Sequence, residues 1–163
     1  MRPASPCRSC PIPGPGPDLV PGAEGIALAR AMNDHLAEGV ARHPDRLKGF
    51  AVLPMLSPDA AAAELTRTVK EFGFLGGLIN GTTDGKFLDD PCYDGLLAQA
   101  AALDVPIYIH PHLAPDAVRD AYYGGLEPGA GRVLEAGAGA GTPKPRCMCC
   151  GWCWRGRWTS TSR

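Results

Sequence analysis

The spacing of apolar residues predicts three helices in the middle of the chain. From 24 to 43, apolar positions recur at helical spacing and lie largely on one stripe, which we expect to face a core. A second helix is predicted over 58–72, where Ser57 is placed to cap the first turn and Gly73 to end the last one. A third is predicted over 92–103, which is rich in alanine and leucine. The stripe of the first helix consists of Ile26, Leu28, Ala29, Met32, Leu36 and Val40.

Short apolar runs alternate with these helices and predict buried strands at 47–55, 74–80 and 105–110. Strands that are apolar on both faces and separated by helices pair in parallel through helical crossovers. The predicted fold class is therefore α/β, with a parallel sheet or an arc of a barrel. Gly76 and Gly77, inside the second strand, permit another segment to approach its backbone closely.

Length and composition limit how much of a barrel the chain can hold. It has 163 residues, whereas a complete (β/α)₈ barrel needs roughly 250. Residues 23–138 carry nine basic and sixteen acidic side chains, and residues 1–22 carry seven of the 17 prolines. Residues 139–163 carry five basic residues, no acidic ones, all three tryptophans and four of the seven cysteines. We therefore expect a partial barrel over 18–138, with irregular ends at 1–17 and 139–163.

Two features of the sequence bear on where the protein resides. No apolar run approaches the ~20 residues of a membrane-spanning helix, and Met1 is not followed by a secretory type of segment. Seven cysteines without such a segment do not suggest a disulfide framework. We therefore expect reduced thiols and a cytoplasmic location.

The ends of the predicted strands carry the candidate functional residues, because ligands of parallel α/β proteins bind beyond the carboxyl ends of the strands. His110 ends the third strand, where its imidazole can ligate zinc or a similar divalent ion. It can equally be a structural residue that terminates the strand. Asn80 ends the second strand and can bind a substrate, or serve as a turn residue before Gly81. Spacing alone does not decide between these alternatives.

Three motifs occur in the middle of the chain: HPDRLKGFAVLP (43–54), GFLGGLING (73–81) and VPIYIHP (105–111). In combination they resemble the decarboxylases of the amidohydrolase superfamily. These enzymes remove carbon dioxide from aromatic acids such as dihydroxybenzoates and γ-resorcylate, or from aminocarboxymuconate semialdehyde. The likeness covers about 18–138 of the chain.

The resemblance implies a (β/α)₈ barrel with one divalent metal, zinc or manganese, at the carboxyl ends of the strands. It also implies that His110 is one of the metal ligands. In such an enzyme the metal would hold the carboxylate and a neighbouring hydroxyl of the substrate, while an acidic group protonates the ring carbon. The implied partner is a small carboxylic acid. No nucleic acid or membrane is expected as a partner, and intact relatives can form homo-oligomers.

The chain also departs from the family pattern. The Glu-x-His or His-x-His pair of the first strand, the later Gly-His-x-Gly-Glu motif and a late aspartate have no counterpart in it. Because a catalytic metal needs about three protein ligands, we expect a fragment of a decarboxylase that does not retain the metal and is inactive as written. The alternatives are a metal-dependent hydrolase of the same superfamily, and a non-enzymatic truncated product or cysteine-rich binding module.

Both ends of the chain can be interpreted as out-of-frame sequence. When the third base of each codon is joined to the first two bases of the next, free choice of bases lets 138–159 encode an amphipathic helix that resembles the family. The same shift lets 6–11 encode an apolar run like a barrel strand. A zinc site is the competing interpretation of the tail, but its cysteines do not form two well-spaced pairs. They are Cys147, Cys149, Cys150 and Cys153.

Overall fold

The structure is a computed structural model, and it describes residues 8–10, 16–110, 120–121 and 125–127. The domain boundaries expected from the sequence fall partly outside these ranges and stay a prediction. The chain divides into two compact units, each of which is described by itself. They are Met1–Ile79 with Asp94–Tyr108, and Asn80–Tyr93 with Ile109–Arg163.

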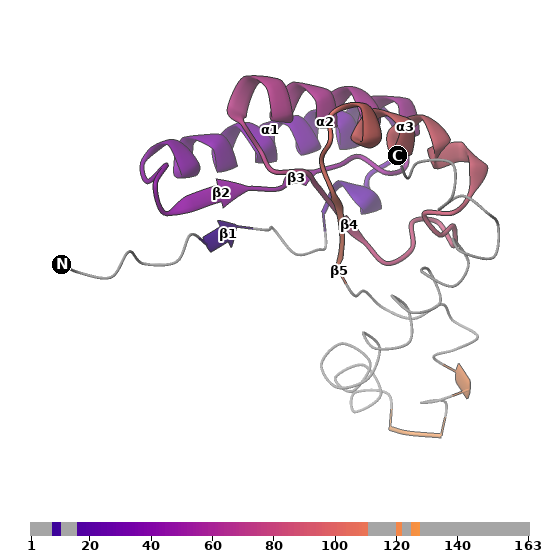
Figure 1. The fold of residues 1–163 in the computed structure, drawn as a ribbon. Coiled ribbons are helices and arrows are strands. Elements are labelled where there is room, and N and C mark those ends of the chain that lie inside the picture. Colours follow the sequence, from indigo (N-terminus) through magenta and orange to yellow (C-terminus); the bar gives the residue numbers. More distant parts are fainter. Residues whose placement is uncertain (1–7, 11–15, 111–119, 122–124, 128–163) are drawn as a thin grey trace. The chain divides into compact units, whose positions relative to one another are not determined.

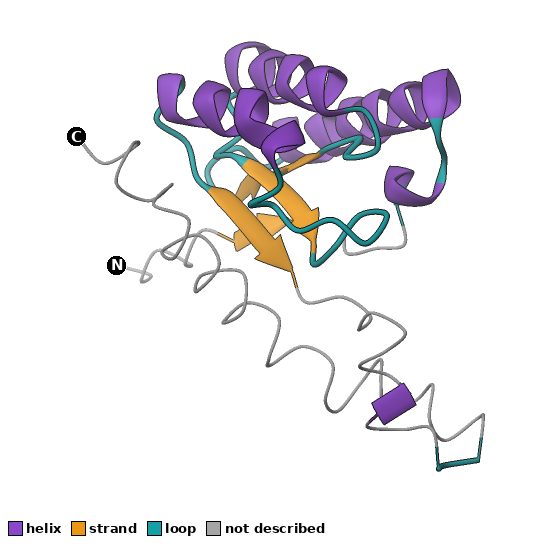
Figure 2. Cartoon of the chain, turned by 90° about the vertical axis from the view of Figure 1, so that its right-hand side faces the viewer, coloured by secondary structure: helices purple, strands orange, loops and turns teal. Residues whose placement is uncertain are grey.

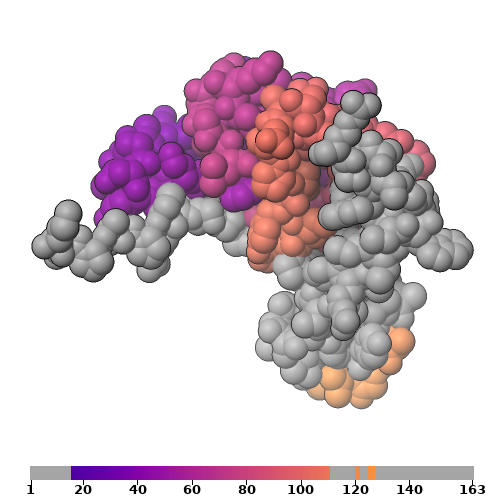
Figure 3. All heavy atoms as spheres, viewed as in Figure 1, coloured from indigo at the N-terminus to yellow at the C-terminus, as the bar shows by residue number. Residues whose placement is uncertain are grey.

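Helices lie on one side of the strands in the first unit (Figures 1 and 2). They are α1 (Gly22–Ala41), α2 (Pro58–Phe72) and α3 (Asp94–Ala102), and a short 3₁₀ turn, η1 (Pro17–Leu19), precedes α1. Helices α2 and α3 pack against each other, and Figure 3 shows their atoms as one continuous surface. The three helices correspond to the three that the apolar spacing predicts. No helix among the described residues has both the length and the apolar character needed to cross a membrane.

The described strands form two sheets. They are β1 (Arg8–Cys10), β2 (Leu47–Gly49), β3 (Ala51–Val52), β4 (Gly77–Asn80) and β5 (Ile107–His110). Strands β1 and β2 pair in parallel, and the other sheet has the order β3-β4-β5, with β3 parallel to β4. Strand β5 is parallel to β4 as well, because the Gly77 N–H donates to the Pro106 carbonyl and the Gly81 N–H to that of His110, at the same offset in sequence. The predicted α/β class with a parallel sheet is confirmed.

The single strand predicted over 47–55 is divided between the two sheets. Strand β2 pairs with β1, whereas β3 pairs with β4, and Phe50 separates them. Strand β1 also differs from the expectation of an irregular head, since these three residues align with Leu47–Gly49. The apolar run therefore has a strand neighbour on each edge, β1 beside its first part and the segment that contains β4 beside its second part.

Helix α1 buries the face that its apolar stripe predicts, but two residues at the margins of that stripe are exposed. Ala29 and Val40 are buried as expected, but Ile26 and Leu28 are 38% and 40% exposed. The buried line also contains the polar residue Asn33, which is fully buried. The prediction for Ile26 and Leu28 is wrong because these two residues flank the line formed by the buried residues, one on each side.

Helix α2 begins and ends as predicted. Ser57 occupies the N-cap position, but its side chain makes no capping hydrogen bond. Its carbonyl accepts from the Ala61 N–H at 2.9 Å, and Pro58 is the first helical residue. Gly73 follows the last turn in the left-handed conformation, with φ of 66°. Leu65, at the centre of the helix, is fully buried.

Glycines let the strands of the first unit approach closely. The sequence predicts this for Gly76 and Gly77, which lie at the start of β4. A Cβ at Gly77 would lie 2.7 Å from the Leu53 side chain, and a Cβ at Gly76 would lie 2.1 Å from the Pro106 carbonyl oxygen. At Gly77 the obstacle is the end of a side chain, which can shift, whereas at Gly76 it is backbone, which cannot. The approach of the next strand therefore depends above all on Gly76 having no side chain.

The described part of the second unit begins with a polar loop that contains a tight turn. Thr83 and Lys86 exchange backbone hydrogen bonds of 3.1 and 3.0 Å. Between them, Asp84 and Gly85 have φ of 51° and 70°, as a two-residue type I′ turn requires. A 3₁₀ turn, η2 (Pro91–Tyr93), then precedes α3, so the helix predicted from Cys92 begins two residues later than expected.

Candidate functional site

Asn80 and His110 are the last residues of adjacent parallel strands, β4 and β5. The Gly81 N–H donates a hydrogen bond of 3.0 Å to the His110 carbonyl. In a parallel ladder an N–H bonds to the residue before its partner, so Asn80 stands opposite His110. Residues directly opposite each other project from the same face of a sheet, with strands about 4.8 Å apart. The two candidates that the sequence places on separate strands are thus brought together.

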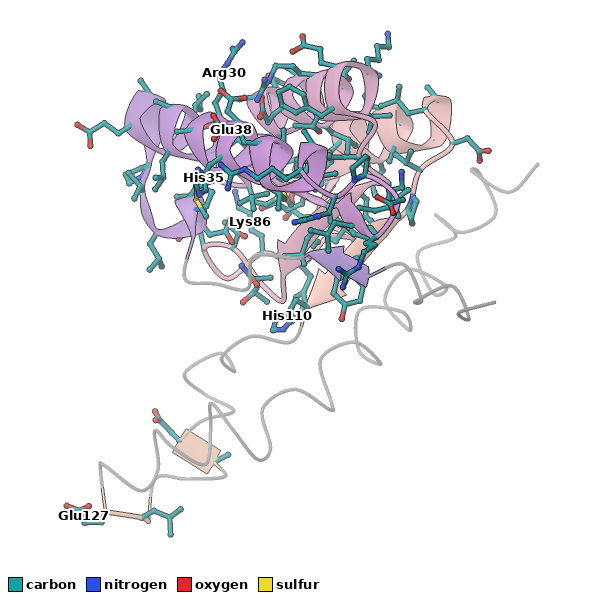
Figure 4. The ribbon with its side chains drawn as sticks, turned by 90° about the vertical axis from the view of Figure 1, so that its left-hand side faces the viewer. Arg30, His35, Glu38, Lys86, His110 and Glu127 are labelled. Atoms are coloured by element: carbon teal, nitrogen blue, oxygen red, sulfur yellow. The ribbon has the colours of Figure 1, made fainter. Side chains whose placement is uncertain are left out.

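The polar atoms of this pair are partly shielded from solvent. Asn80 is 8% exposed, and its Oδ1 atom is buried. His110 is half-buried, with Nδ1 inaccessible to solvent, and Figure 4 shows its imidazole at the end of β5. A buried nitrogen and an accessible remainder of the ring suit a histidine that uses one nitrogen for orientation and the other for a ligand.

The loop between Asn80 and Tyr93 is anchored at several points in the second unit. Thr83 and Leu88 are each 5% exposed, and Tyr93 is 2% exposed. The carboxylate of Asp90 accepts a hydrogen bond of 3.0 Å from the Cys92 N–H, as expected of a residue that caps the turn before α3. The loop that follows the candidate site is therefore held by its own buried residues.

Cys92 is an exposed free thiol in this loop. Its partial desolvation and its hydrogen bond with the Asp90 carboxylate raise the pKa of the thiol above the ordinary value, and the nearby Lys86 opposes this only in part. Because the thiolate is the nucleophilic form of cysteine, this environment makes Cys92 less nucleophilic than an ordinary exposed cysteine.

The described residues supply few further metal ligands. No group of three or more His, Cys, Asp or Glu side chains that could hold a metal ion occurs within 16–110 or the short described segments beyond it. His35 projects from α1 into solvent, with Glu38 at 3.8 Å (Figure 4). His112 and the four cysteines of the tail lie outside the described residues.

The sequence pattern missed Asn33 in the first unit. Its amide contacts both Val52 and Glu64, and all three residues are nearly or completely buried. A signal for it exists in retrospect, because Gly25, Ala29 and Asn33 follow one another at intervals of four and form one helix face. A polar residue on a line of small buried residues indicates a specific hydrogen-bonding role.

Comparison with known proteins places these features in a family. The family model described as amidohydrolase matches residues 12–139. A decarboxylase from Emericella nidulans, orsB, is 50% identical over 95 residues, which is 57% of this chain and 29% of that protein. The γ-resorcylate decarboxylase of Rhodococcus jostii is 47% identical over 107 residues, 60% of this chain and 32% of the relative.

Solved structures agree with the sequence matches. The 2,6-dihydroxybenzoate decarboxylase from Rhizobium superposes with a TM-score of 0.84 at 30% identity, covering 96% of this chain and 49% of that one. The dihydroxybenzoic acid decarboxylase from Polaromonas, with bound manganese and the inhibitor 2-nitroresorcinol, gives 0.80 at 31% identity, covering 91% and 45%.

The match is extensive in this chain but partial in its relatives. The chain spans about a third of the length of the curated relatives, 29% and 32% of the two above, and about half of the solved structures. The family model nevertheless covers most of the 163 residues, including every strand from β2 to β5. The chain therefore belongs to the amidohydrolase family.

Proposed function

We propose that this chain is part of a metal-dependent decarboxylase that acts on a hydroxybenzoate type of acid, with His110 as a metal ligand and Asn80 as a substrate-binding residue. The observation that carries the proposal is the pairing of Asn80 with His110 at the carboxyl ends of two parallel strands. The names of the relatives support the reaction class, since orsB and the γ-resorcylate enzymes are decarboxylases.

The two side chains suit different tasks in such a reaction. A neutral imidazole donates a nitrogen lone pair to a divalent metal, and its other nitrogen can be held by the protein. The amide of Asn80 can donate to a carboxylate or hydroxyl oxygen and can accept from a hydroxyl group. Its near-complete burial would make such a hydrogen bond costly to leave unmade.

The metal itself is constrained by the available ligands. A catalytic site needs about three protein ligands, whereas the described residues contain no such group. We therefore assign no catalytic step through a metal to the described residues, and we expect weak metal binding by this chain. Manganese is present in the Polaromonas relative, and zinc is a second ion that an imidazole would accept.

A hydrolase is the second candidate, because the matching family is described as amidohydrolase. A metal in that class lowers the pKa of a bound water for attack on an ester or amide. The decarboxylase remains preferred, since the two curated relatives above that are about half identical to the matched part of this chain both carry that name.

The test compares the 163-residue chain with a longer protein. In the longer protein the reading frame at both ends is restored and the missing barrel strands are added. Each is incubated with 2,6-dihydroxybenzoate and Mn²⁺, and released carbon dioxide is measured, with an aryl ester offered in parallel. We expect decarboxylation by the restored protein and none by the 163-residue chain. Ester hydrolysis without carbon dioxide release by the restored protein would instead establish the hydrolase.

A further inference from the structure

The backbone of Val52 in β3 is bonded to a side chain rather than to a strand on one of its edges. The Val52 N–H donates to Oδ1 of Asn33 at 2.8 Å, and Nδ2 of Asn33 donates to the Val52 carbonyl at 2.9 Å. Asn33 is fully buried, and Val52 is 6% exposed. One amide group thus satisfies both backbone groups of a single residue, as a neighbouring strand would.

The position of this contact along the strand shows which neighbour is replaced. The Gly49 carbonyl accepts from Leu75, and the Ala51 N–H donates to Gly76, so both residues bond toward the segment that contains β4. Because backbone groups alternate between the two edges of a strand, Val52 faces the opposite edge. That is the edge to which β1 is added, and the paired register of β1 ends at Gly49.

Asparagine is the residue type that fits this position. The second proton of Nδ2 goes to Oε1 of Glu64 at 2.8 Å, and Glu64 is in turn held by Arg67 at 2.7 and 2.9 Å. A carboxylate can only accept, so Glu64 requires the donor end of the Asn33 amide on its side. Aspartate at position 33 could still accept from Val52 but could donate to neither partner.

We propose that Asn33 is a positioning residue that stands in for a strand at the end of the β1–β2 pairing and fixes the carboxyl end of β3. The segment that follows this end, Leu53–Met55, is buried throughout. In a parallel barrel the residues that follow such a strand end are those that carry chemistry. The consequence for catalysis rests on the proposed function, whereas the positioning role does not.

Amide hydrogen exchange of the 163-residue chain separates the local bond from global stability. The readout is the exchange rate of Val52 relative to that of Ala51, whose N–H bonds to Gly76 on the other edge. We expect Asn33→Leu, which keeps the branched shape of the side chain but not its hydrogen bonding, to raise this ratio about tenfold, the factor that corresponds to one lost hydrogen bond.

Thr68→Val is the matched control, because Thr68 is fully buried and donates to the carbonyls of Glu64 and Leu65 without touching Val52. It should accelerate Val52 and Ala51 equally. A ratio unchanged by Asn33→Leu would overturn the proposal. If that variant does not fold, the scalar coupling across the hydrogen bond between the Val52 amide nitrogen and the Asn33 side-chain carbonyl in the unmodified chain decides: its presence supports the proposal and its absence refutes it.

Discussion

Gly76 in the segment that leads into β4 lies so close to Pro106 that a Cβ at position 76 would be 2.1 Å from the Pro106 carbonyl oxygen. The obstacle is backbone, which cannot rotate away as a side chain can. The same carbonyl accepts the Gly77 N–H at 3.2 Å, so moving it would also break a hydrogen bond of the sheet. Gly76 is thus a requirement of strand pairing.

Gly76→Ala should therefore lower the free energy of unfolding by about 3 kcal/mol, the upper part of the range for overpacking a core. The measurement is the denaturant midpoint followed by circular dichroism. Gly39→Ala in α1 is the control, since a Cβ there meets nothing within 4 Å. Alanine should stabilise that helical position by about 0.5–1 kcal/mol. Equal effects of the two variants would contradict the close approach.

The helices show where sequence patterns are sufficient. Ser57, Pro58 and Gly73 are local signals, and the bounds of α2 follow from them directly. The burial of Asn33 in α1 is not a local property, because it depends on a partner that lies 19 residues further along the chain, the Val52 backbone. Hydrophobicity alone therefore predicts the face of α1 but neither the burial of Asn33 nor the exposure of Ile26 and Leu28.

The candidate site was predictable only in part for a similar reason. Motif and strand-end position select His110 and Asn80 separately, but their pairing depends on the register of β4 against β5. The division of 47–55 into β2 and β3 was not predictable from its apolar run, since it depends on where the pairing with β1 ends and the pairing with β4 begins. Register and edge partners are tertiary properties that periodicity does not contain.

Arg67 should contribute strongly to the stability of the first unit. Its guanidinium bonds to Glu64 at 2.7 Å and Asp34 at 2.8 Å, and it lies 4.9 Å from the centre of the Phe72 ring. The hydrogen bond with Glu64 is the main cause that raises the pKa of Arg67, so the arginine stays charged throughout the usual pH range. Its removal would leave the buried Glu64 carboxylate without its cation.

We expect Arg67→Met to lower the free energy of unfolding by about 2–3 kcal/mol, somewhat less than for a fully buried pair. Lys70→Met, on the exposed side of the same helix, should change it by less than about 0.5 kcal/mol. Chemical denaturation of both variants provides the comparison. A small effect at Arg67 would show that solvent replaces the guanidinium at Glu64.

The thiol of Cys92 should become more reactive when Asp90 is neutralised. The carboxylate of Asp90 helps to raise the pKa of Cys92 above its ordinary value, so less thiolate exists in the folded chain than in the unfolded chain near and above neutral pH. The Cys92 thiol therefore stabilises the folded state at pH values below its unfolded pKa. This contribution to stability is lost as the pH rises through its folded pKa.

Asp90→Asn keeps an acceptor for the Cys92 N–H but removes the charge, and we expect alkylation of Cys92 to accelerate several-fold at pH 8. Peptide mapping after brief iodoacetamide treatment isolates this cysteine from the other six. Asp84→Asn is the control, because asparagine tolerates the positive φ of that turn position. A rate that Asp84→Asn raises equally would point to the net charge of the loop instead.

His110 alone should not hold a catalytic metal in this chain. One imidazole gives weak and readily exchanged metal binding, because a catalytic site needs about three protein ligands. We expect the 163-residue chain to bind Mn²⁺ weakly at most and to show no decarboxylation of 2,6-dihydroxybenzoate.

In the frame-restored protein, His110→Ala should lower Mn²⁺ affinity at least tenfold and abolish carbon dioxide release. His35→Ala, which removes an imidazole that is 87% exposed on α1, should alter neither quantity. Paramagnetic resonance of free Mn²⁺ and carbon dioxide release measure the two effects independently. Turnover by the 163-residue chain that a chelator removes would refute the ligand count, and a restored protein that tolerates His110→Ala would refute the role of His110.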